Sequence, residues 1–464
     1  MPWLVAAGFY VLLLALGGRI LADPDIYWHV RVGQWIAEHR AFPHTDSFSA
    51  TFAGAPWIAK EWLSQLVFAA AYQLASWNAV AVLSAAAVAA AFGVLTRALL
   101  EKLDPVAVLV LVLAAIMLSA SHIVARPHAL ALPVMVLWTA GLVRALDAQR
   151  APSWWLLPLM TLWANLHGGF TFGLFLIGAC TLEALLVADK AERKAAAWRW
   201  ISFGVLAVLA ACITPYGAES ILMTHRILGL GEALALLLEW QPQDFSQPGA
   251  FELCLLGAIG FALHRGLTLP PLRILVVLGL LHMALAHVRN AELLGLLAPL
   301  FVAAPLRDQL GSDQHADDKS PSRSLAIGLA LLAAFATVAL LMTRELIPGR
   351  HVTPSAAVAA LTRAKAGPIF NDYGFGGYLI HAGVPSFIDG RAELYGGAFI
   401  ARHHRAVILE NLPGFLALLE EYKIGATLLP PQRPAVALLD RLPNWERLHS
   451  DDIAVVHVRK AAAQ

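Results

Sequence analysis

Long apolar stretches separated by short polar loops fill roughly the first three quarters of the chain. A helix needs about 20 predominantly apolar residues to cross the hydrocarbon core of a bilayer, which is about 30 Å thick. On this basis the pattern predicts about eleven membrane spans, near residues 3–22, 79–100, 105–121, 127–146, 154–166, 168–188, 199–214, 250–264, 272–288, 291–305 and 324–343. The region 154–188 fits either one broken helix or two helices. The first stretch has no basic residues before it and no small-residue cleavage site before Asp23, so we interpret it as a retained membrane helix.

Lysine and arginine gather in one set of short loops, including those around residues 97–102, 144–150, 190–199 and 265–273. Such loops belong on the cytoplasmic side of a membrane. The N-terminus is then expected in the cytoplasm and the tail beyond residue 343 on the outer face. Arg19 and Arg31 argue locally against this orientation of the first span, but the later loops outweigh them.

The last quarter of the chain has a different pattern. A polar linker at 308–323 precedes the last span. Beyond residue 350, short apolar runs alternate with helical patterns, which predicts a small α/β domain. The apolar runs are 368–371, 386–389, 426–429 and 453–458, and the helical patterns are 399–409, 413–421 and 434–442. We therefore expect a mostly α fold: a transmembrane helical bundle over 1–343, with a long first outer loop at 23–60, and an extracytoplasmic α/β domain over 344–464.

Composition supports a protein embedded in a lipid bilayer. Hydrophobic residues make up 59% of the chain and charged residues 14%, and the mean hydropathy is +0.65. Soluble domains have about 45–50% apolar and about 25% charged residues. The net charge of +1 and the lack of a basic stripe argue against a nucleic-acid partner. The three cysteines form no C-x-x-C pair, so they indicate buried apolar residues rather than a zinc or redox site.

The first outer loop is rich in polar and aromatic residues. Residues 26–38 have helical spacing, and Trp28 and Trp35 would anchor this helix at the membrane interface. Asp23 and Asp25 lie just before it. A carboxylate there could act as a general base, the pair could hold a divalent metal through oxygen ligands, or Asp-Pro-Asp could only cap the helix.

Other polar residues fall in loops predicted on the same outer side. Ionisable residues at membrane depth are functional candidates, and arginine is the preferred phosphate ligand. In each case the alternative is an ordinary loop residue, or for the arginines a salt bridge to Glu292, Asp23 or Asp46. Residues 218–239, interrupted by Gly229 and Gly231, are interpreted as an outer amphipathic or re-entrant helix, with an extra span as the alternative.

Several motifs resemble those of a group of bacterial polytopic membrane proteins. They are Asp23-Pro-Asp-Ile-Tyr-Trp-His29, Arg126-Pro-His128, Trp163-Ala-Asn-Leu-His-Gly-Gly169, Pro215-Tyr-Gly217, Glu239-Trp240, Phe370-Asn-Asp-Tyr-Gly-Phe-Gly-Gly-Tyr378 and Phe387-Ile-Asp-Gly-Arg391. This group is similar to the GT-C glycosyltransferases, which include protein O-mannosyltransferases and the lipid A aminoarabinose transferase.

The resemblance implies an enzyme of the bacterial cytoplasmic (inner) membrane that takes a sugar from a polyprenyl-phosphate carrier on the outer face. The acidic residue at the end of the first helix of these enzymes corresponds to Asp23 or Asp25. The family's common Asp-Glu pair is replaced here by Asp-Pro-Asp, which leaves open which carboxylate is the base and whether a divalent metal takes part.

The expected activity is inverting transfer of a sugar to an acceptor hydroxyl, with Asp25, assisted by Asp23, as the catalytic base. The candidates for binding the donor phosphate are Arg126, Arg289, Lys60 and His167. The other site candidates are His29, Asp46, His128, Asn165, Tyr216 and Glu239. In the tail, the glycines of 374–377 indicate a structural turn, with a phosphate loop as the alternative. The sequence Asp389-Gly-Arg391 indicates a turn with a local salt bridge, with an acceptor contact as the alternative. Rival interpretations are a transporter or flippase, a polysaccharide ligase or polymerase, and a non-catalytic GT-C-like protein. The sequence identifies neither the sugar nor the outer acceptor.

Overall fold

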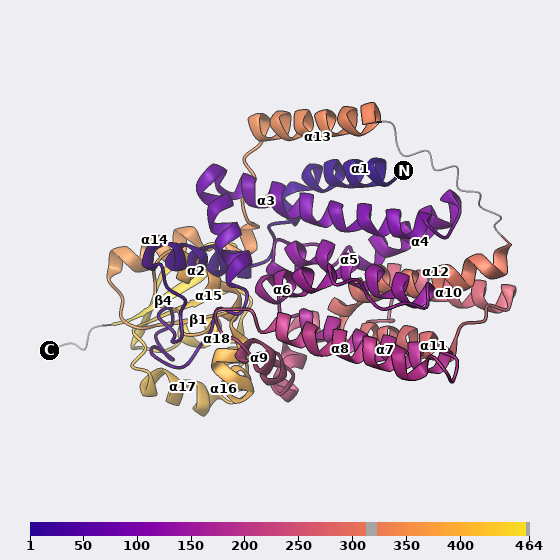
Figure 1. Cartoon of the computed structure of the whole chain (residues 1–464). Coiled ribbons are helices and arrows are strands. Elements are labelled where there is room, and N and C mark those ends of the chain that lie inside the picture. The colour runs from indigo at the N-terminus through magenta and orange to yellow at the C-terminus, as the bar shows by residue number, and fades with distance from the viewer. Residues whose placement is uncertain (312–322, 461–464) are drawn as a thin grey trace. The chain divides into compact units, whose positions relative to one another are not determined.

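A computed structural model describes residues 1–311 and 323–460 (Figure 1). The chain forms two compact units. The first unit comprises Met1–Gly17, Ala81–Leu222 and Leu237–Glu345, and the second comprises Gly18–Val80, Met223–Leu236 and Leu346–Gln464. The first is helical, whereas the second combines helices with a small sheet.

Each of the eleven predicted spans coincides with a helix. These helices are α1 (Pro2–Ala15), α3 (Trp62–Leu100), α4 (Pro105–Ser119), α5 (Pro127–Asp147), α6 (Leu156–Leu166), α7 (Phe170–Val187), α8 (Arg193–Ala211), α10 (Ala250–Arg265), α11 (Pro271–Ala286), α12 (Ala291–Leu310) and α13 (Arg323–Thr343). Among the described residues, six helices are long and apolar enough to cross a membrane, and α1, α4, α6 and α11 are shorter apolar helices. The region 154–188 forms two helices, α6 and α7.

Two helices differ from the predicted boundaries. The first ends at Ala15, because a 3-10 turn, η1 (Gly17–Arg19), begins at a pair of glycines, which favour a chain break. Helix α3 begins 17 residues before the predicted span and is interrupted at Ala75 and Ser76, where Ser76 has a φ of +53°. The predicted span is the part of α3 that follows this kink.

The stretch 218–239 is not a continuous helix. It contains α9 (Glu219–Leu228) and the 3-10 turns η2 (Gly231–Leu236) and η3 (Leu238–Trp240). Helix α9 has ten residues, about half of what a bilayer crossing requires. An ordinary extra span over this stretch is therefore wrong.

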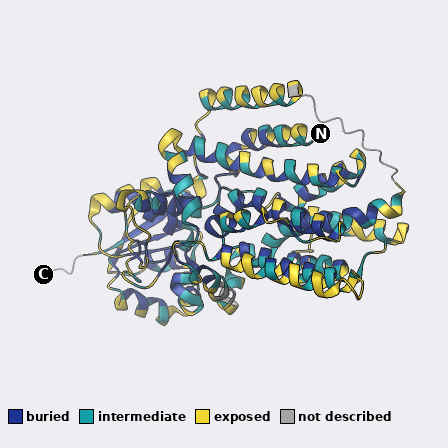
Figure 2. Ribbon diagram, in the orientation of Figure 1, coloured by how far each residue is buried: buried dark blue, intermediate teal, exposed yellow. Residues whose placement is uncertain are grey.

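The surface of the first unit carries many large apolar side chains. Phe175 on α7, Leu263 on α10 and Met342 on α13 are 70%, 79% and 83% exposed. Figure 2 shows α13 largely without buried positions, whereas buried residues fill the sheet region of the second unit. Water does not accommodate so much apolar surface, and lipid does. The protein is a multi-pass membrane protein.

Buried charges join the helices at one end of the first unit. Arg273 of α11 donates through Nε to Glu183 of α7 at 2.7 Å and through Nη2 to Asp147 of α5 at 2.6 Å. Lys102 lies 3.4 Å from the same Asp147 carboxylate. These pairs neutralise charges that lipid would not solvate. They lie at the end that carries the loops rich in lysine and arginine.

The opposite end of this unit holds the C-terminal ends of α4, α6, α8 and α11 and the N-terminal ends of α5, α7, α10 and α12. Proline at the first position starts α5 and α11, where its missing N–H costs no hydrogen bond. The motifs that contain Arg126, His167, Tyr216 and Glu239 fall at or between these helix ends.

The second unit contains α2 (Asp25–His39) and the start of α3, together with the tail. The tail helices are α14 (Ser355–Ala364), α15 (Gly376–His381), α16 (Ala392–Val407), α17 (Leu412–Glu421) and α18 (Pro434–Leu439), with 3-10 turns η5 (Arg350–Val352) and η6 (Tyr373–Phe375). The strands are β1 (Ile369–Asn371), β2 (Ala426–Leu429), β3 (Trp445–Ser450) and β4 (Val455–Arg459), and their order in the sheet is β1-β2-β4-β3.

Strand β1 pairs parallel to β2, with Phe370 opposite Thr427, and the other pairs are antiparallel. The core beside the sheet includes Leu361, Phe375 and Val456. The α/β prediction for the tail is thus confirmed, with two corrections. Residues 386–389 form only an isolated bridge, from Ser386 to Ser49. Strand β3 had not been predicted, since its exposed, mostly polar sequence lacks an apolar run.

Helix α2 confirms the predicted helix at 26–38, but Trp28 does not anchor it at a lipid interface. Trp28 is only 5% exposed and is buried within the second unit. Helix α2 packs on α15, and Gly33 lets it approach the Gln65 carbonyl, where a Cβ would lie only 2.0 Å from the oxygen.

Candidate functional site

Six ionisable residues come together at one end of the first unit, and we call them the arginine–glutamate cluster. They are His122, Arg126, His128, Glu239, Arg289 and Glu292. Each comes from a helix start or the turn before one: His122 follows α4, Arg126 and His128 begin α5, Glu239 lies in η3, and Arg289 and Glu292 lie in and just after the 3-10 turn η4 (Val288–Asn290). Four of the six had been predicted as site candidates.

Glu239 bridges the two arginines. Arg126 Nη1 donates a hydrogen bond to Glu239 Oε2, and Arg289 Nη1 donates to Oε1 at 2.9 Å. The Arg289 guanidinium also lies over the Trp240 ring, 4.7 Å from its centroid. Burial opposes ionisation of Glu239, but the two guanidinium groups outweigh it and hold its pKa well below the usual value. The partner that the two arginines share is therefore another predicted site residue.

A second, more buried layer lies next to Glu239. The Nδ1 atom of His122 is 3.3 Å from Glu292 Oε2, and its Nε2 atom is 3.8 Å from Glu239 Oε2. His128 Nε2 donates to the His122 carbonyl at 3.0 Å. Burial lowers the pKa of His122, but its contacts with Glu239 and Glu292 raise it by more, so the pKa lies above its usual value. His122 is thus favoured as an imidazolium between two carboxylates.

The same layer has the spacing of a metal site. One ligand atom from each of His122, His128 and Glu292 lies within 4.8 Å of the others, and all three residues are buried. Nitrogen and carboxylate donors of this kind suit zinc better than magnesium. His122, His128 and Glu292 could hold a divalent metal once His122 has given up a proton, and this set does not include Asp23 or Asp25.

Three predicted residues lie in or next to turns at this end of the first unit. His167 is in the break between α6 and α7, where its Nδ1 accepts from the Gly169 N–H at 3.1 Å, and its ring is 6.2 Å from that of His128. Asn165 donates to the carbonyls of Thr161 and Ile213, at 2.7 and 2.9 Å. Tyr216 is buried in the turn after α8. His167 therefore borders the cluster, while the amide of Asn165 joins the end of α6 to the turn after α8.

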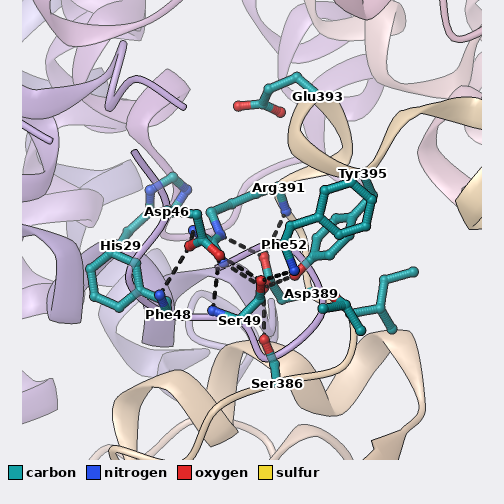
Figure 3. A network of polar contacts seen from close by, with 12 residues as sticks. His29, Asp46, Phe48, Ser49, Phe52, Ser386, Asp389, Arg391, Glu393 and Tyr395 are labelled. Carbon is teal, nitrogen blue, oxygen red and sulfur yellow. Dashed lines mark hydrogen bonds and ion pairs between the residues drawn. The ribbon is translucent and has the colours of Figure 1, made fainter. Parts of the chain in front are cut away.

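The remaining candidates belong to the second unit, where Asp46 takes part in a fully buried ion network (Figure 3). Arg391 donates through Nη1 to Asp46 at 2.6 Å and through Nε and Nη2 to Asp389, each at 2.8 Å. Ser386 and Tyr395 also donate to Asp389. The predicted local salt bridge between Asp389 and Arg391 is confirmed, and the additional contact with Asp46 joins the first loop to the tail.

Lys60 and His29 lie in the same unit. Lys60 forms a 2.9 Å ion pair with Glu393 of α16. The His29 ring lies 3.6 Å from that of Trp28, and its Nδ1 is 3.4 Å from the Gln65 amide nitrogen. Lys60 therefore makes a second ionic contact between the first loop and the tail.

The Asp-Pro-Asp turn is tightly enclosed by tail residues. The Asp23 carboxylate accepts a hydrogen bond from the Asp25 N–H at 2.8 Å, as a capping residue does. Asp25 lies so close to Gly390 that a Cβ on this glycine would be 1.9 Å from the Asp25 carboxylate. A Cβ at Gly377 would lie 2.4 Å from the Pro24 carbonyl. These close approaches confirm that the tail glycines serve a structural purpose.

Sequence reasoning had not singled out His122, Glu292, Trp240 or Arg391 as site residues. His122 and Glu292 were visible as ionisable residues next to predicted spans, which is the only signal for them. Arg391 was recognised in its turn, but its contact with Asp46, 345 residues away, has no local signal.

Neither a protein-family model nor a curated protein sequence matches this chain. Solved structures do. The archaeal oligosaccharyltransferase AglB from Archaeoglobus fulgidus, in complex with an inhibitory peptide and a dolichol-phosphate, is 13% identical with a TM-score of 0.57, over 92% of this chain and 69% of AglB. The apo form of the Archaeoglobus fulgidus oligosaccharyltransferase is 12% identical with a TM-score of 0.50, over the same shares. ArnT from Cupriavidus metallidurans, bound to undecaprenyl phosphate, is 14% identical with a TM-score of 0.49, over 98% of each chain.

At such low identity the likeness to the oligosaccharyltransferase concerns the fold alone. It confirms the fold that the sequence motifs implied: this multi-pass membrane protein has the fold of the GT-C glycosyltransferases.

Proposed function

We propose that the protein is an inverting glycosyltransferase that moves a sugar from a polyprenyl-phosphate carrier to an acceptor hydroxyl at the outer face of the cytoplasmic membrane. The observation that carries this proposal is the convergence of Arg126 and Arg289, from two separate helix starts, on one carboxylate. Two guanidinium groups that share one anion form a site for a phosphate. The shared fold supports the proposal, because AglB was solved with a dolichol-phosphate.

The cluster would act mainly on the leaving group. When the bond between the anomeric carbon and the phosphate oxygen breaks, its electron pair stays on the phosphate, whose negative charge grows. Cations already held in place stabilise that charge without reorganising during the reaction. Arg126 and Arg289 are held in this way by Glu239, and Trp240 supports Arg289 from one side.

We assign the base to Asp25. It would take the proton of the acceptor hydroxyl while the hydroxyl oxygen bonds to the anomeric carbon, and a single displacement of this kind inverts the configuration. Asp23 is less suited, because its carboxylate already accepts the Asp25 N–H. The roles of Asp25 and of the two arginines are separate proposals with separate tests.

The proposal places the tail and the arginine–glutamate cluster outside the cell. Single cysteines at exposed Glu446 in the tail and at exposed Lys190 between α7 and α8, in a chain lacking its three native cysteines, report the orientation. We expect an impermeant maleimide to label the first in intact cells and the second only after lysis. The reverse pattern would exclude transfer on the outer face.

The direct test is activity. Purified protein in nanodiscs is incubated with defined polyprenyl-phosphate sugars, and free polyprenyl phosphate and transferred sugar are followed by mass spectrometry. The transferase is supported if sugar release is lost when Arg126 or Arg289 is replaced and is kept when the exposed Arg405 is replaced as a control. In proteoliposomes, movement of an intact lipid-linked sugar without its release would instead support a flippase.

A further inference from the structure

The Glu239 carboxylate holds the two guanidinium groups in the way that a phosphate would. Each of its oxygens takes one arginine, so both Nη1 donors are occupied by a single anion. We propose that Glu239 is a placeholder: it occupies the phosphate position while no lipid phosphate is bound and is displaced when one binds. This inference rests on the proposed binding of the donor phosphate by Arg126 and Arg289.

Exposure within the cluster supports displacement. The side chains of Glu239, Arg289 and Arg126 are 26%, 21% and 18% exposed, whereas those of His122, His128 and Glu292 are 10% or less. An incoming anion therefore meets the two arginines and Glu239 first, and the histidine layer lies beneath them. A carboxylate needed only to neutralise the arginines would be expected in the buried layer, where Glu292 already lies.

The structure also provides a second position for the displaced carboxylate. His122 Nε2 is buried, has no hydrogen-bond partner among the residues that the structure describes, and lies 3.8 Å from Glu239 Oε2. A hydrogen bond of this kind is about 2.8–3.0 Å long, so a shift of about 1 Å would let Glu239 accept from His122. The buried nitrogen, which costs free energy while unsatisfied, would then be satisfied.

Glu239 is well placed for such a movement. It belongs to a three-residue 3-10 turn in the connection between α8 and α10, not to a long helix. Its neighbour Trp240 is held by His287, whose Nδ1 lies 2.7 Å from the Trp240 carbonyl oxygen. The backbone of the turn is thereby anchored, so the exchange needs only a rotation of the Glu239 side chain between Arg126 and His122.

The consequence is competition between Glu239 and the lipid phosphate. The carboxylate would prevent adventitious anions from occupying the arginines. It would also return to them when the product phosphate leaves, which favours release. Removing its charge should therefore tighten phosphate binding and slow product release, whereas removing a purely structural counter-charge should weaken binding or destabilise the unit.

The test is a calorimetric titration of the full-length protein, in detergent micelles, with farnesyl phosphate, a short prenyl monophosphate. Farnesol is the control for micelle and chain effects. We expect Glu239→Gln to bind farnesyl phosphate about five- to tenfold more tightly, within the range of coupling between charged groups that share a site. In multiple turnover the variant should show a lower KM and a lower kcat.

Asp244→Asn is the matched control, because it removes one exposed negative charge five residues further along the same loop. An equal gain in Asp244→Asn would mean that net charge alone explains the result and would overturn the proposal. Weaker or unchanged binding in Glu239→Gln would also overturn the proposal. Glu239→Ala is tested in parallel as a second variant without the charge. If the wild type binds farnesyl phosphate no better than farnesol, the proposed phosphate site itself fails, which is distinguishable from both outcomes.

Discussion

The two units each contain a group of guanidinium–carboxylate pairs, and the two groups differ in access and in hydrogen bonding. In the second unit, the side chains of Arg391, Asp46 and Asp389 are 0% exposed, and Arg391 donates through Nε, Nη1 and Nη2. In the arginine–glutamate cluster the arginines are about one fifth exposed, and within the described part of the chain His122 Nε2 and Glu292 Oε1 have no hydrogen-bond partner.

This difference separates a structural use of charge from a ligand site. A buried network in which the donors and acceptors are satisfied holds segments together and has no capacity left for a ligand. Buried polar atoms without partners are rare in folded proteins and call for an explanation, such as a ligand or a movement. By this criterion the Arg391 network joins the first loop to the tail, and the cluster is the group that we propose as an anion site.

The largest expected effect concerns two neighbouring carboxylates, Asp23 and Asp25, one of which we assign to catalysis and the other to structure. The Asp23 carboxylate accepts a local backbone N–H, whereas we assign Asp25 to the base. We expect Asp25→Asn to lower the transfer rate about 10²–10⁴-fold, as loss of a general base does. Asp23→Ala should cost about 1 kcal/mol of stability, as loss of a cap does.

Rates of sugar release and thermal unfolding of both variants decide the assignment. If both variants keep their transfer rate and only melt earlier, both carboxylates are structural.

The second effect concerns stability. Arg391→Met would leave Asp46 and Asp389 buried without their cation, and breaking a buried pair in this way costs about 3–5 kcal/mol. We expect poor folding of the second unit, seen as loss of monodisperse protein in size-exclusion chromatography. The control is Arg405→Met, because Arg405 is 57% exposed and its contact with Glu410 is 3.8 Å long. Equal yields of the two variants would contradict the structural role of the Arg391 network.

The sequence was sufficient for the helices and for most of the tail, because long apolar windows and turn residues act locally. It also predicted that Arg126, His128, Glu239 and Arg289 lie close together, because the alternation of spans places their loops at one end. The pairing within the cluster could not be predicted, since it depends on side-chain contacts between segments more than 100 residues apart, such as that of Arg126 with Glu239.

Errors arose where tertiary contacts overrode a local pattern. Tryptophans such as Trp28 often anchor a helix at the membrane interface, but here helix α2 packs against α15 of the tail and Trp28 is buried. The apolar run 386–389 suggests a strand, but Ser386 and Asp389 serve the Arg391 network instead. Helix α3 extends beyond its apolar window because a kink at Ser76 joins two helical segments.

The third prediction concerns the cluster, where we expect a large effect on binding and a smaller one on stability. Arg126→Ala and Arg289→Ala should weaken binding of farnesyl phosphate about 10- to 100-fold, because a hydrogen bond to a charged group contributes about 1.5–3 kcal/mol. They should change the melting temperature less than Arg391→Met, since both arginines are partly exposed. Arg→Lys variants should recover only part of the affinity, because a lysine lacks the two-pronged donor geometry. Unchanged binding with an early melting transition would place the cluster with the structural networks.

The smallest effect is the dependence of stability on pH. It should have opposite signs for His403 in the tail and His122 in the cluster. Burial lowers the pKa of His403 in the tail to about 4. The Asp372 carboxylate raises this pKa and the Arg433 guanidinium lowers it, but burial has the largest effect. Because its pKa in the fold lies below the unfolded value of about 6.5, the stability it contributes is complete above pH 6.5 and is lost as the pH falls toward 4.

His122 in the cluster should behave in the reverse manner. Its pKa is raised, since Glu239 and Glu292 outweigh burial and the repulsion from Arg289. The stability contributed by its charge is therefore complete below the unfolded pKa and is lost as the pH rises through the raised value. We expect His403→Gln to reduce the loss of thermal stability between pH 6.5 and 4, and His122→Gln to reduce the loss on the alkaline side. Melting temperatures of the full-length protein, measured from pH 4 to the alkaline side, test both expectations. A profile that either variant shifts in the opposite direction would show that the histidine is held in the other charge state.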